Sequence, residues 1–309
     1  MRLLVGTMVT IENEFEACLA SIQRQTYQNF EQLVIRDLPN REAHEALYGT
    51  FFERRDEFDL LVKVDADMVV SSPTFFAEVV DRFGRNPELQ ILSVAVHDYF
   101  TDRLVSGLNT YRNTIPWQRT GDLVFTDQFP SLIGAVTADR DDLAPAAAHS
   151  PDPGPFQAFH FGLHRGVKSR VSAVRRMHAD HYARFQDLHL TWEHFLRCRD
   201  PRLGLAAVGG ELALAGRFDE THLSYGNEEV EAAFDKYRDL DAAALQREVE
   251  RLARDHWGVL PAPWRREMLR HDYLTLPIRL VVPYSLRQRS AHVLGKITRR
   301  LGLHREASR

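Results

Sequence analysis

Short apolar runs alternate with amphipathic segments over the first 64 residues, and this alternation restricts the fold more than any other feature. The runs predict strands over residues 2–9, 30–35 and 60–64. A helix capped by Thr10 is predicted after the first strand, and a second helix over residues 41–55. A strand–helix–strand series pairs its strands in parallel through right-handed crossovers. The sequence therefore predicts an α/β fold with a mostly parallel sheet flanked by helices.

The remaining elements are assigned by the same periodicities. Ser72 caps a predicted helix over 74–83 that Gly84 ends. Further strands are predicted over 91–100, 105–111 and 123–125, a loop over 139–155, and helices over 178–198, 202–215 and 227–256.

Composition places the chain among ordinary globular proteins. It has 309 residues, of which 44% are hydrophobic and 27% charged, enough for one large core with additions. Cys18 and Cys198 have neither metal-ligand spacing nor the pattern of a disulfide framework. The N-terminus has no leader pattern, and no apolar run has the length of a membrane span. We therefore expect a cytoplasmic protein.

Charge is unevenly distributed along the chain. Residues 264–309 contain eleven Lys and Arg against three acids, so this segment is basic while the rest of the chain carries a net negative charge. Its apolar residues recur at helical intervals among the arginines, as in an interfacial amphipathic helix. One interpretation is a tail that binds an anionic membrane surface, which would make the protein peripheral at the inner face of the membrane. The other is a helix docked on the body. No nucleic-acid-binding motif accompanies the charge.

Asp65 and Asp67 directly follow the apolar run 60–64. Carboxylate oxygens suit Mg²⁺ or Mn²⁺, and such a cation can bridge a diphosphate. The alternative is a simple turn, because Asp is common where strands end. Asp67 is the expected direct metal ligand, and Asp65 the expected second metal ligand.

Residues at three predicted strand ends are expected to converge. In open parallel sheets, ligands bind beyond the carboxyl ends of the strands. Thr7, Asp37, Asp65 and Asp67 all occupy such positions. Thr7 and Asp37 are therefore candidate ligand contacts, although Asp37 could instead open a turn with Pro39.

Residues 18–31, Cys-Leu-Ala-Ser-Ile-Gln-Arg-Gln-Thr-Tyr-Gln-Asn-Phe-Glu, resemble the signature of family 2 glycosyltransferases. Together with Asp65-Ala66-Asp67, they resemble the nucleotide-binding half of a GT-A fold. The resemblance implies that Thr7 and Asp37 contact the nucleotide and that Asp65 contacts the ribose or shares the metal. The resemblance covers about the first third of the chain. It implies a nucleoside diphosphate sugar donor, most often a UDP-sugar, a divalent metal, and usually inversion at the anomeric carbon.

The chain departs from this family in three places. The family has paired acids after the second strand. This chain has Arg36-Asp37 there, so only Asp37 is carried over as the nucleoside contact. Gly6-Thr7 stands where a Pro-Thr pair commonly ends the first strand. The stretch between Asp37 and Asp65 is short, which implies a missing strand or a trimmed base pocket.

The segment 159–168 combines glycines, histidines and basic residues. It resembles the element with which many GT-A enzymes close the donor site. His160 and His164 share a face and are candidate metal ligands, while Arg165 and Lys168 are candidate diphosphate contacts. The alternative is a core or surface histidine beside a basic loop.

Two acids are candidates for the general base that an inverting transfer requires. Asp127 lies among apolar neighbours, and Glu228 lies in an acidic stretch that loosely resembles an acceptor-side motif. The alternatives are a loop acid for Asp127 and a helix N-terminal acid for Glu228. His178, His181, His189 and His194 suggest a second metal site, but they lack partners at zinc spacing, which favours a solvated helix.

These observations predict a metal-dependent glycosyltransferase acting on a glycan or lipid-linked acceptor. The expected domains are a GT-A core over 1–175, a helical acceptor-side region over 176–260 and the basic amphipathic tail over 261–309. Two alternatives are a catalytically silent nucleotide- or glycan-binding or membrane-adaptor module, and a nucleotidyltransferase of related fold. The latter would need a Gly-rich basic loop after the first strand, which residues 6–14 lack.

Overall fold

The computed structural model describes residues 1–126, 137–141, 145–175 and 178–259. The chain divides into two compact units. The first comprises residues 1–158 and 220–232, and the second comprises 159–219 and the residues from 233 onward. Asp127 and the basic tail lie outside the described residues.

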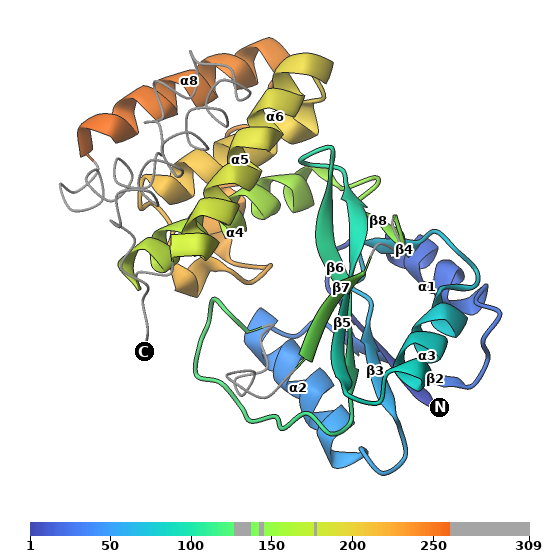
Figure 1. Cartoon of the computed structure of the whole chain (residues 1–309). Helices are drawn as coiled ribbons and strands as arrows, with labels where there is room; N and C mark the ends of the chain where they lie inside the picture. Colours follow the sequence, from blue (N-terminus) through green and yellow to red (C-terminus); the bar gives the residue numbers. More distant parts are fainter. Residues whose placement is uncertain (127–136, 142–144, 176–177, 260–309) are drawn as a thin grey trace, which may run out of the picture. The chain divides into compact units, whose positions relative to one another are not determined.

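The first unit is built on an eight-stranded mixed sheet (Figure 1). Its strands are β1 (Leu3–Val9), β2 (Phe30–Arg36), β3 (Leu60–Lys63), β4 (Met68–Val70), β5 (Leu89–Asp98), β6 (Arg103–Arg112), β7 (Thr137–Asp141) and β8 (Ala147–His149). The order is β2-β1-β3-β6-β5-β8-β4, and β7 pairs with β5. Parallel pairing of β1 with both β2 and β3 confirms the prediction from the alternating pattern.

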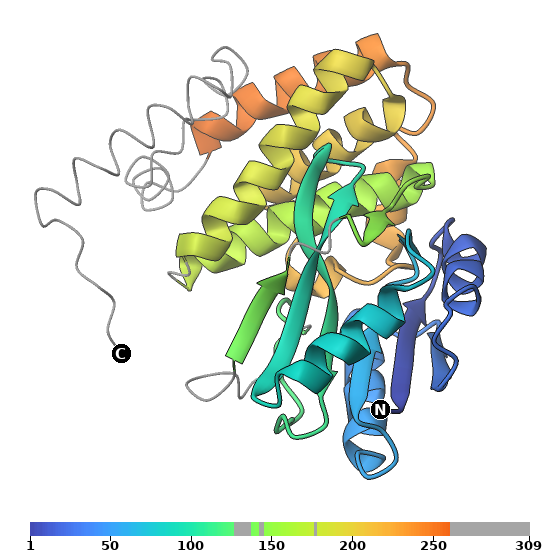
Figure 2. The same cartoon turned by 45° about the vertical axis from the view of Figure 1, so that its right-hand side comes forward.

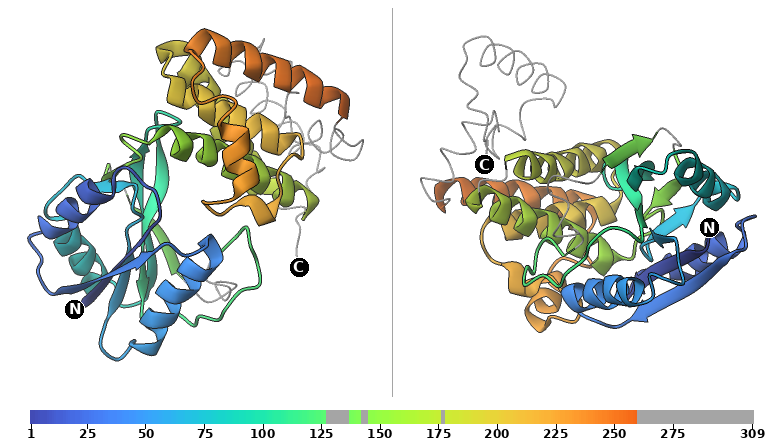
Figure 3. Two further views of the ribbon diagram at one scale, coloured as in Figure 1. Left: turned by 180° about the vertical axis from the view of Figure 1, so that it is seen from behind. Right: turned by 60° about the horizontal axis from the view of Figure 1, so that its bottom comes forward.

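Three helices cover the sheet: α1 (Phe15–Gln23), α2 (Asn40–Glu53) and α3 (Phe75–Arg85). Side chains of α1 and α3 join one apolar cluster with β1, β3 and β5, whereas those of α2 join a second cluster. Figures 2 and 3 show α3 on one face of the sheet and α2 on the opposite face. The first unit therefore has a layered α/β architecture consistent with the GT-A type, which confirms the predicted fold class.

The second unit is helical. Its described elements are most of α4 (Pro155–Val174), α5 (His178–Cys198), α6 (Pro201–Leu214), part of α7 (Glu228–Phe234), and α8 (Ala242–Val259). A short 3₁₀ helix, η1 (Glu220–His222), precedes α7 and belongs to the first unit. Helix α6 is buried along nearly its whole length and packs on α5 and α8. Among the described residues, no helix is both long and apolar enough to cross a membrane.

Glycines allow α4 and α6 to approach each other closely. A Cβ on Gly162 would lie 1.7 Å from the carbonyl oxygen of Ala206, and one on Gly209 would lie 2.1 Å from that of Phe159. Neither position can hold a side chain without moving backbone. Gly162, one of the glycines in the segment 159–168, thus allows the close approach of a second helix.

Several predicted boundaries are wrong for local reasons. Helix α1 begins at Phe15, because the Glu12 carboxylate accepts hydrogen bonds from the backbone N–H groups of Thr10 and Ile11 and holds a turn there. Residues 123–125 form no strand, since Asp122 Oδ1 accepts from the N–H groups of Val124 and Phe125.

Three further corrections concern longer segments. Helix α3 continues past Gly84 to Arg85. The predicted loop 139–155 contains the end of β7 and all of β8. The predicted helix 227–256 is divided into α7 and α8, and Asp241 Oδ1 caps α8 by accepting from the Ala244 N–H at 2.7 Å.

Candidate functional site

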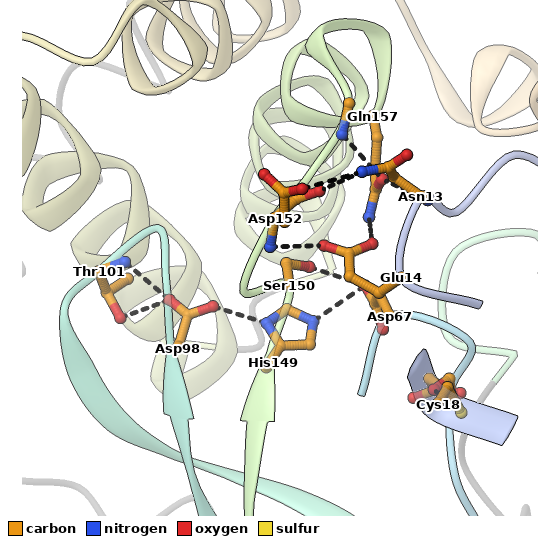
Figure 4. A network of polar contacts seen from close by, with 12 residues as sticks. Asn13, Glu14, Cys18, Asp67, Asp98, Thr101, His149, Ser150, Asp152 and Gln157 are labelled. Carbon is orange, nitrogen blue, oxygen red and sulfur yellow. Dashed lines mark hydrogen bonds and ion pairs between the residues drawn. The ribbon is translucent and has the colours of Figure 1, made fainter. Parts of the chain in front are cut away.

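The turn between β3 and β4 carries Asp65 and Asp67 beyond the carboxyl end of β3. Figure 4 shows Asp67 and its neighbours. The N–H of Met68 donates to the carbonyl oxygen of Asp65 at 2.9 Å, which closes the turn. Both carboxylates are partly accessible, with side-chain exposures of 33% for Asp65 and 21% for Asp67. The pair is thus placed at the sheet edge where ligands of α/β proteins bind.

Asp67 is held on one side only. Its Oδ2 lies 3.2 Å from Nε2 of His149 and accepts a hydrogen bond from Oγ of Ser150 at 3.0 Å. The N–H of Ser150 also donates to the carbonyl oxygen of Asp67 at 2.7 Å. Within the described part of the chain, Oδ1 of Asp67 has no hydrogen-bonding partner. One oxygen is therefore fixed, and the other is available to a ligand.

His149 reaches Asp67 because of how β8 is paired. In the sheet, His149 is opposite Met68 of β4 and beside Asp98 of β5. Its Nδ1 lies 2.6 Å from Oδ1 of Asp98. Ser150, the next residue, has a φ of 48°, a left-handed conformation that is uncommon for a residue with a side chain. This turn directs both donors of Ser150 to Asp67.

The three charged groups shift one another's pKa values. Burial favours the neutral forms, but the opposite charges and hydrogen bonds outweigh it. They lower the pKa of Asp67 to about 2, lower the pKa of Asp98, and raise the pKa of His149 well above its usual range. His149 is therefore a cation at neutral pH, situated between two carboxylates.

Asp65 is fixed by two neighbours. The ammonium of Lys63, a buried residue of β3, lies 2.5 Å from Asp65 Oδ1. The thiol of Cys18 donates to the carbonyl oxygen of Asp65 at 3.6 Å. Burial, together with Asp67 and Asp65, raises the pKa of Cys18 to about 12, so this thiol stays protonated and is not a nucleophile.

Two glutamates from the turn after β1 belong to the same site. Glu14 is buried, and its carboxylate accepts from the Asp152 N–H at 3.1 Å and from Nε2 of Gln157 at 3.0 Å. Asn13 reinforces this link, because its N–H donates to Oε1 of Gln157. The turn after β1 is thereby tied to the segment that follows β8.

The pKa values of both glutamates are raised. Burial is the main cause, and the negative charge of Asp67 adds to it. The pKa of Glu12 rises to about 7, and that of Glu14 rises above its usual range. Burial and the charges of Glu12, Asp67 and Glu14 also raise the pKa of Tyr225, which lies in the 220–232 segment of the same unit. These acids are mutually repulsive, and a bound cation would relieve the repulsion.

The donor set at Asp67 fits a hard divalent cation. Mg²⁺ and Mn²⁺ prefer carboxylate oxygens, and Mg²⁺ is usually held by one or two carboxylates together with substrate phosphates. Among the described residues, no group of three or more His, Cys, Asp or Glu side chains is arranged to hold a metal by itself.

No protein-family model and no curated protein matches this chain. Among solved structures, the mannosyltransferase PcManGT from Pyrobaculum calidifontis, determined in complex with GDP-Man and Mn²⁺, is similar over 90% of this chain and 86% of its own. The identity is 14% and the TM-score is 0.37. A197 from STIV is similar over 45% of this chain and 82% of its own, with 14% identity and a TM-score of 0.32.

The other residues predicted at the strand ends have different environments. Asp37 is exposed beyond β2, has a φ of 56°, and donates its N–H to the carbonyl oxygen of Val9. It therefore lies where a nucleoside contact was expected. Thr7 lies inside β1 and is completely buried, so its side chain is not accessible to a ligand that binds from solvent.

The basic and histidine residues predicted from segment 159–168 lie on α4, in the second unit. The rings of His160 and His164 stack with centroids 6.3 Å apart, so the two residues share a helical face as predicted. Arg165 forms an ion pair with Asp187 of α5, and Lys168 is buried. Their contact with a metal or diphosphate stays a prediction.

The two predicted general bases are not brought into the site by any described contact. Asp127 lies outside the described residues. Glu228 is exposed and is the first residue of α7. This is the position expected for a helix N-terminal acid, the alternative interpretation. The backbones of His178 and His181 lie in α5, and His189 pairs with Glu193 at 3.2 Å.

Sequence reasoning missed four residues of the site: Glu12, Glu14, Asp98 and His149. The two glutamates fall within the first turn of the helix that Thr10 is predicted to cap, although acids directly after a strand's carboxyl end are a usable signal. His149 was hidden because its segment reads as a loop rich in Pro and Ala. Asp98 had no local signal beyond its place at the end of a strand.

Proposed function

We propose that this chain is a metal-dependent glycosyltransferase that takes a sugar from a nucleoside diphosphate sugar. The observation that carries the proposal is the gathering of Asp67, Glu12 and Glu14 beyond the carboxyl ends of parallel strands, with one oxygen of Asp67 left available. A cation at Asp67 would neutralise charge on the departing nucleoside diphosphate.

The residues around this cation have separable roles in the proposal. Asp67 would hold it, and Asp65 would be restrained by Lys63 beside it. Asp37 would contact the nucleoside beyond β2. Glu12, with a pKa of about 7, has the proton affinity expected of a group that accepts a proton from the acceptor hydroxyl at neutral pH. Glu12 thus joins Asp127 and Glu228 as a candidate base.

The finer assignments are also proposals. The family resemblance of residues 18–31 supports a UDP-sugar donor and an inverting transfer. The basic composition of residues 264–309 supports a lipid-linked or surface glycan acceptor at an anionic membrane, with the protein peripheral at its inner face.

The test is metal-dependent hydrolysis of sugar nucleotides, a slow side reaction expected when no acceptor is present. The protein is incubated with Mn²⁺ and a panel of UDP- and GDP-sugars, and released nucleoside diphosphate is measured. We expect hydrolysis of at least one donor, its loss on chelation, and a decrease of about 100-fold or more in Asp67→Asn.

The matched control is Asp56→Asn. Asp56 is exposed and precedes β3, so it lies toward the opposite, amino-terminal edge of the sheet. This variant should behave like the wild type. Hydrolysis that is independent of Mn²⁺, or equal in Asp67→Asn and Asp56→Asn, would contradict the proposed function. Binding of the donor without turnover would favour a silent binding module.

A further inference from the structure

Asp98 is one of the most completely restrained carboxylates among the described residues of the first unit. Its side chain is only 4% exposed and lies at the end of β5. Oδ2 accepts both the N–H of Thr101 at 2.7 Å and its Oγ–H at 2.5 Å. Oδ1 accepts from Nδ1 of His149 at 2.6 Å. Both oxygens are thus satisfied, and the carboxylate cannot turn without losing a buried hydrogen bond.

This restraint passes to His149. The ring has two nitrogens, and a carboxylate on Nδ1 fixes both the proton on that atom and the direction of the ring. Figure 4 shows the ring lying between Asp98 and Asp67, with its second nitrogen toward Asp67. The pairing of β8 with β5 and β4 puts the three residues in line.

We propose that Asp98 is a positioning residue for the acid site: by holding Nδ1–H of His149, it directs Nε2 at Oδ2 of Asp67 and so fixes how Asp67 presents Oδ1 to a cation. The orientation of the His149 ring follows from its contacts with Asp98 and Asp67. The expected effect on cation binding rests on the proposed function. Partners behind metal-site residues commonly change metal affinity by 10- to 100-fold when removed.

The substitution Asp98→Asn tests this chemistry with little change of shape. The N–H of Thr101 can only donate, so the amide oxygen of the new side chain will face Thr101 and its NH₂ group will face His149. Nδ1 must then accept rather than donate, and the proton on that nitrogen is lost. His149 then becomes a neutral ring that still carries Nε2–H, but Nδ1 is held by an uncharged and therefore weaker hydrogen bond, so Nε2–H is directed less firmly at Asp67.

The same hairpin supplies a matched control. Asp102 and His97 form a second Asp–His pair, 3.3 Å apart, at the turn between β5 and β6. Both side chains are about half exposed. Asp102 has a φ of 50°, a conformation that Asn tolerates well. Asp102→Asn therefore removes the same charge from the same turn without touching His149.

Two measurements are made on the full chain. Nitrogen-15 NMR of the histidine rings, with His149→Gln to assign the signal, reports the proton on Nδ1 and needs no metal. Electron paramagnetic resonance of added Mn²⁺ reports its affinity. We expect Asp98→Asn to lose the Nδ1–H signal and to bind Mn²⁺ about 10-fold more weakly or worse, while Asp102→Asn matches the wild type.

The outcomes separate the inference from the proposed function. An intact Nδ1–H signal in Asp98→Asn, or a lost signal with unchanged Mn²⁺ affinity, overturns the positioning role. Mn²⁺ binding that is insensitive to Asp67→Asn counts against the proposed function instead. If Asp98→Asn does not fold, Thr101→Val, which removes one donor to Asp98 and keeps its charge, should still weaken Mn²⁺ binding, and no change in that variant overturns the inference.

Discussion

Nε2 of His149 lies 3.2 Å from Oδ2 of Asp67, although the two residues are far apart in the sequence. The contact links the turn after β3 to the end of β8, and Asp98 extends the link to the β5–β6 hairpin. Two carboxylates and one imidazolium, from the β3–β4 turn, β5 and β8, therefore meet within one small region. The acid site is stabilised by the same residues that orient it.

The first prediction concerns the stability of this link. His149→Ala leaves the buried carboxylate of Asp98 without its cation, and such a loss costs about 3 kcal/mol of unfolding free energy. Adding Asp98→Asn removes the stranded charge, so the double variant should be less destabilised than the sum of the two single variants. Urea denaturation of all four proteins measures this coupling. Additive effects would show that the two side chains do not interact.

The second prediction concerns pH. Glu12 has a pKa of about 7 in the folded protein and 4.5 in the unfolded chain. The folded state thus binds this proton more tightly, and stability falls as pH rises from 4.5 through 7. Glu12→Gln should remove this loss, giving a gain over the wild type that grows to at most about 3 kcal/mol at pH 8.

Urea denaturation at pH 5, 7 and 8 measures the gain in Glu12→Gln. The control is Glu16→Gln, at an exposed position on α1 nearby. A gain in Glu12→Gln that is the same at pH 5 and pH 8 would contradict the burial of an uncompensated charge at this position.

The third prediction concerns helix packing in the second unit. Gly162→Ala would put a Cβ 1.7 Å from the carbonyl oxygen of Ala206, so α4 and α6 must separate, at a cost of about 1–3 kcal/mol. Gly84→Ala is the matched change in α3, where nothing lies within 4 Å, and it should stabilise by about 0.5–1 kcal/mol. Thermal melting distinguishes the two. Equal melting temperatures would contradict the close approach.

The fourth prediction concerns residues 264–309. If this segment binds anionic lipid, the full chain should float with phosphatidylserine vesicles, whereas a chain ending at residue 263 should not. Neutral vesicles and high salt should both abolish flotation of the full chain. Equal flotation of the two chains would remove the membrane proposal and leave the acid site unaffected.

The first three strands and two helices could be predicted because their signals are local. Apolar runs of the right length mark β1, β2 and β3, and helical periodicity marks α1 and α2. The parallel order then follows from connection rules, and it places Asp37, Asp65 and Asp67 at strand ends before any contact is known.

His149 could not be predicted in this way. Strand β8 has only three residues, Ala-Ala-His, between prolines at 145 and 151, and nothing in that composition favours a strand. It is a strand because β4 and β5 pair with it, and both partners are distant in sequence. The roles of Glu12 and Glu14 likewise depend on Asp152, Gln157 and Asp67, which only the folded chain brings to them.

Anomalous scattering from crystals grown with Mn²⁺ and UDP tests cation binding at Asp67 most directly. We expect a manganese peak within coordination distance of Asp67 Oδ1, with the diphosphate completing its coordination and no peak in Asp67→Asn. A manganese ion bound elsewhere while Asp67 stays paired only with His149 and Ser150, or UDP bound away from the carboxyl ends of β1 and β3, would contradict this expectation.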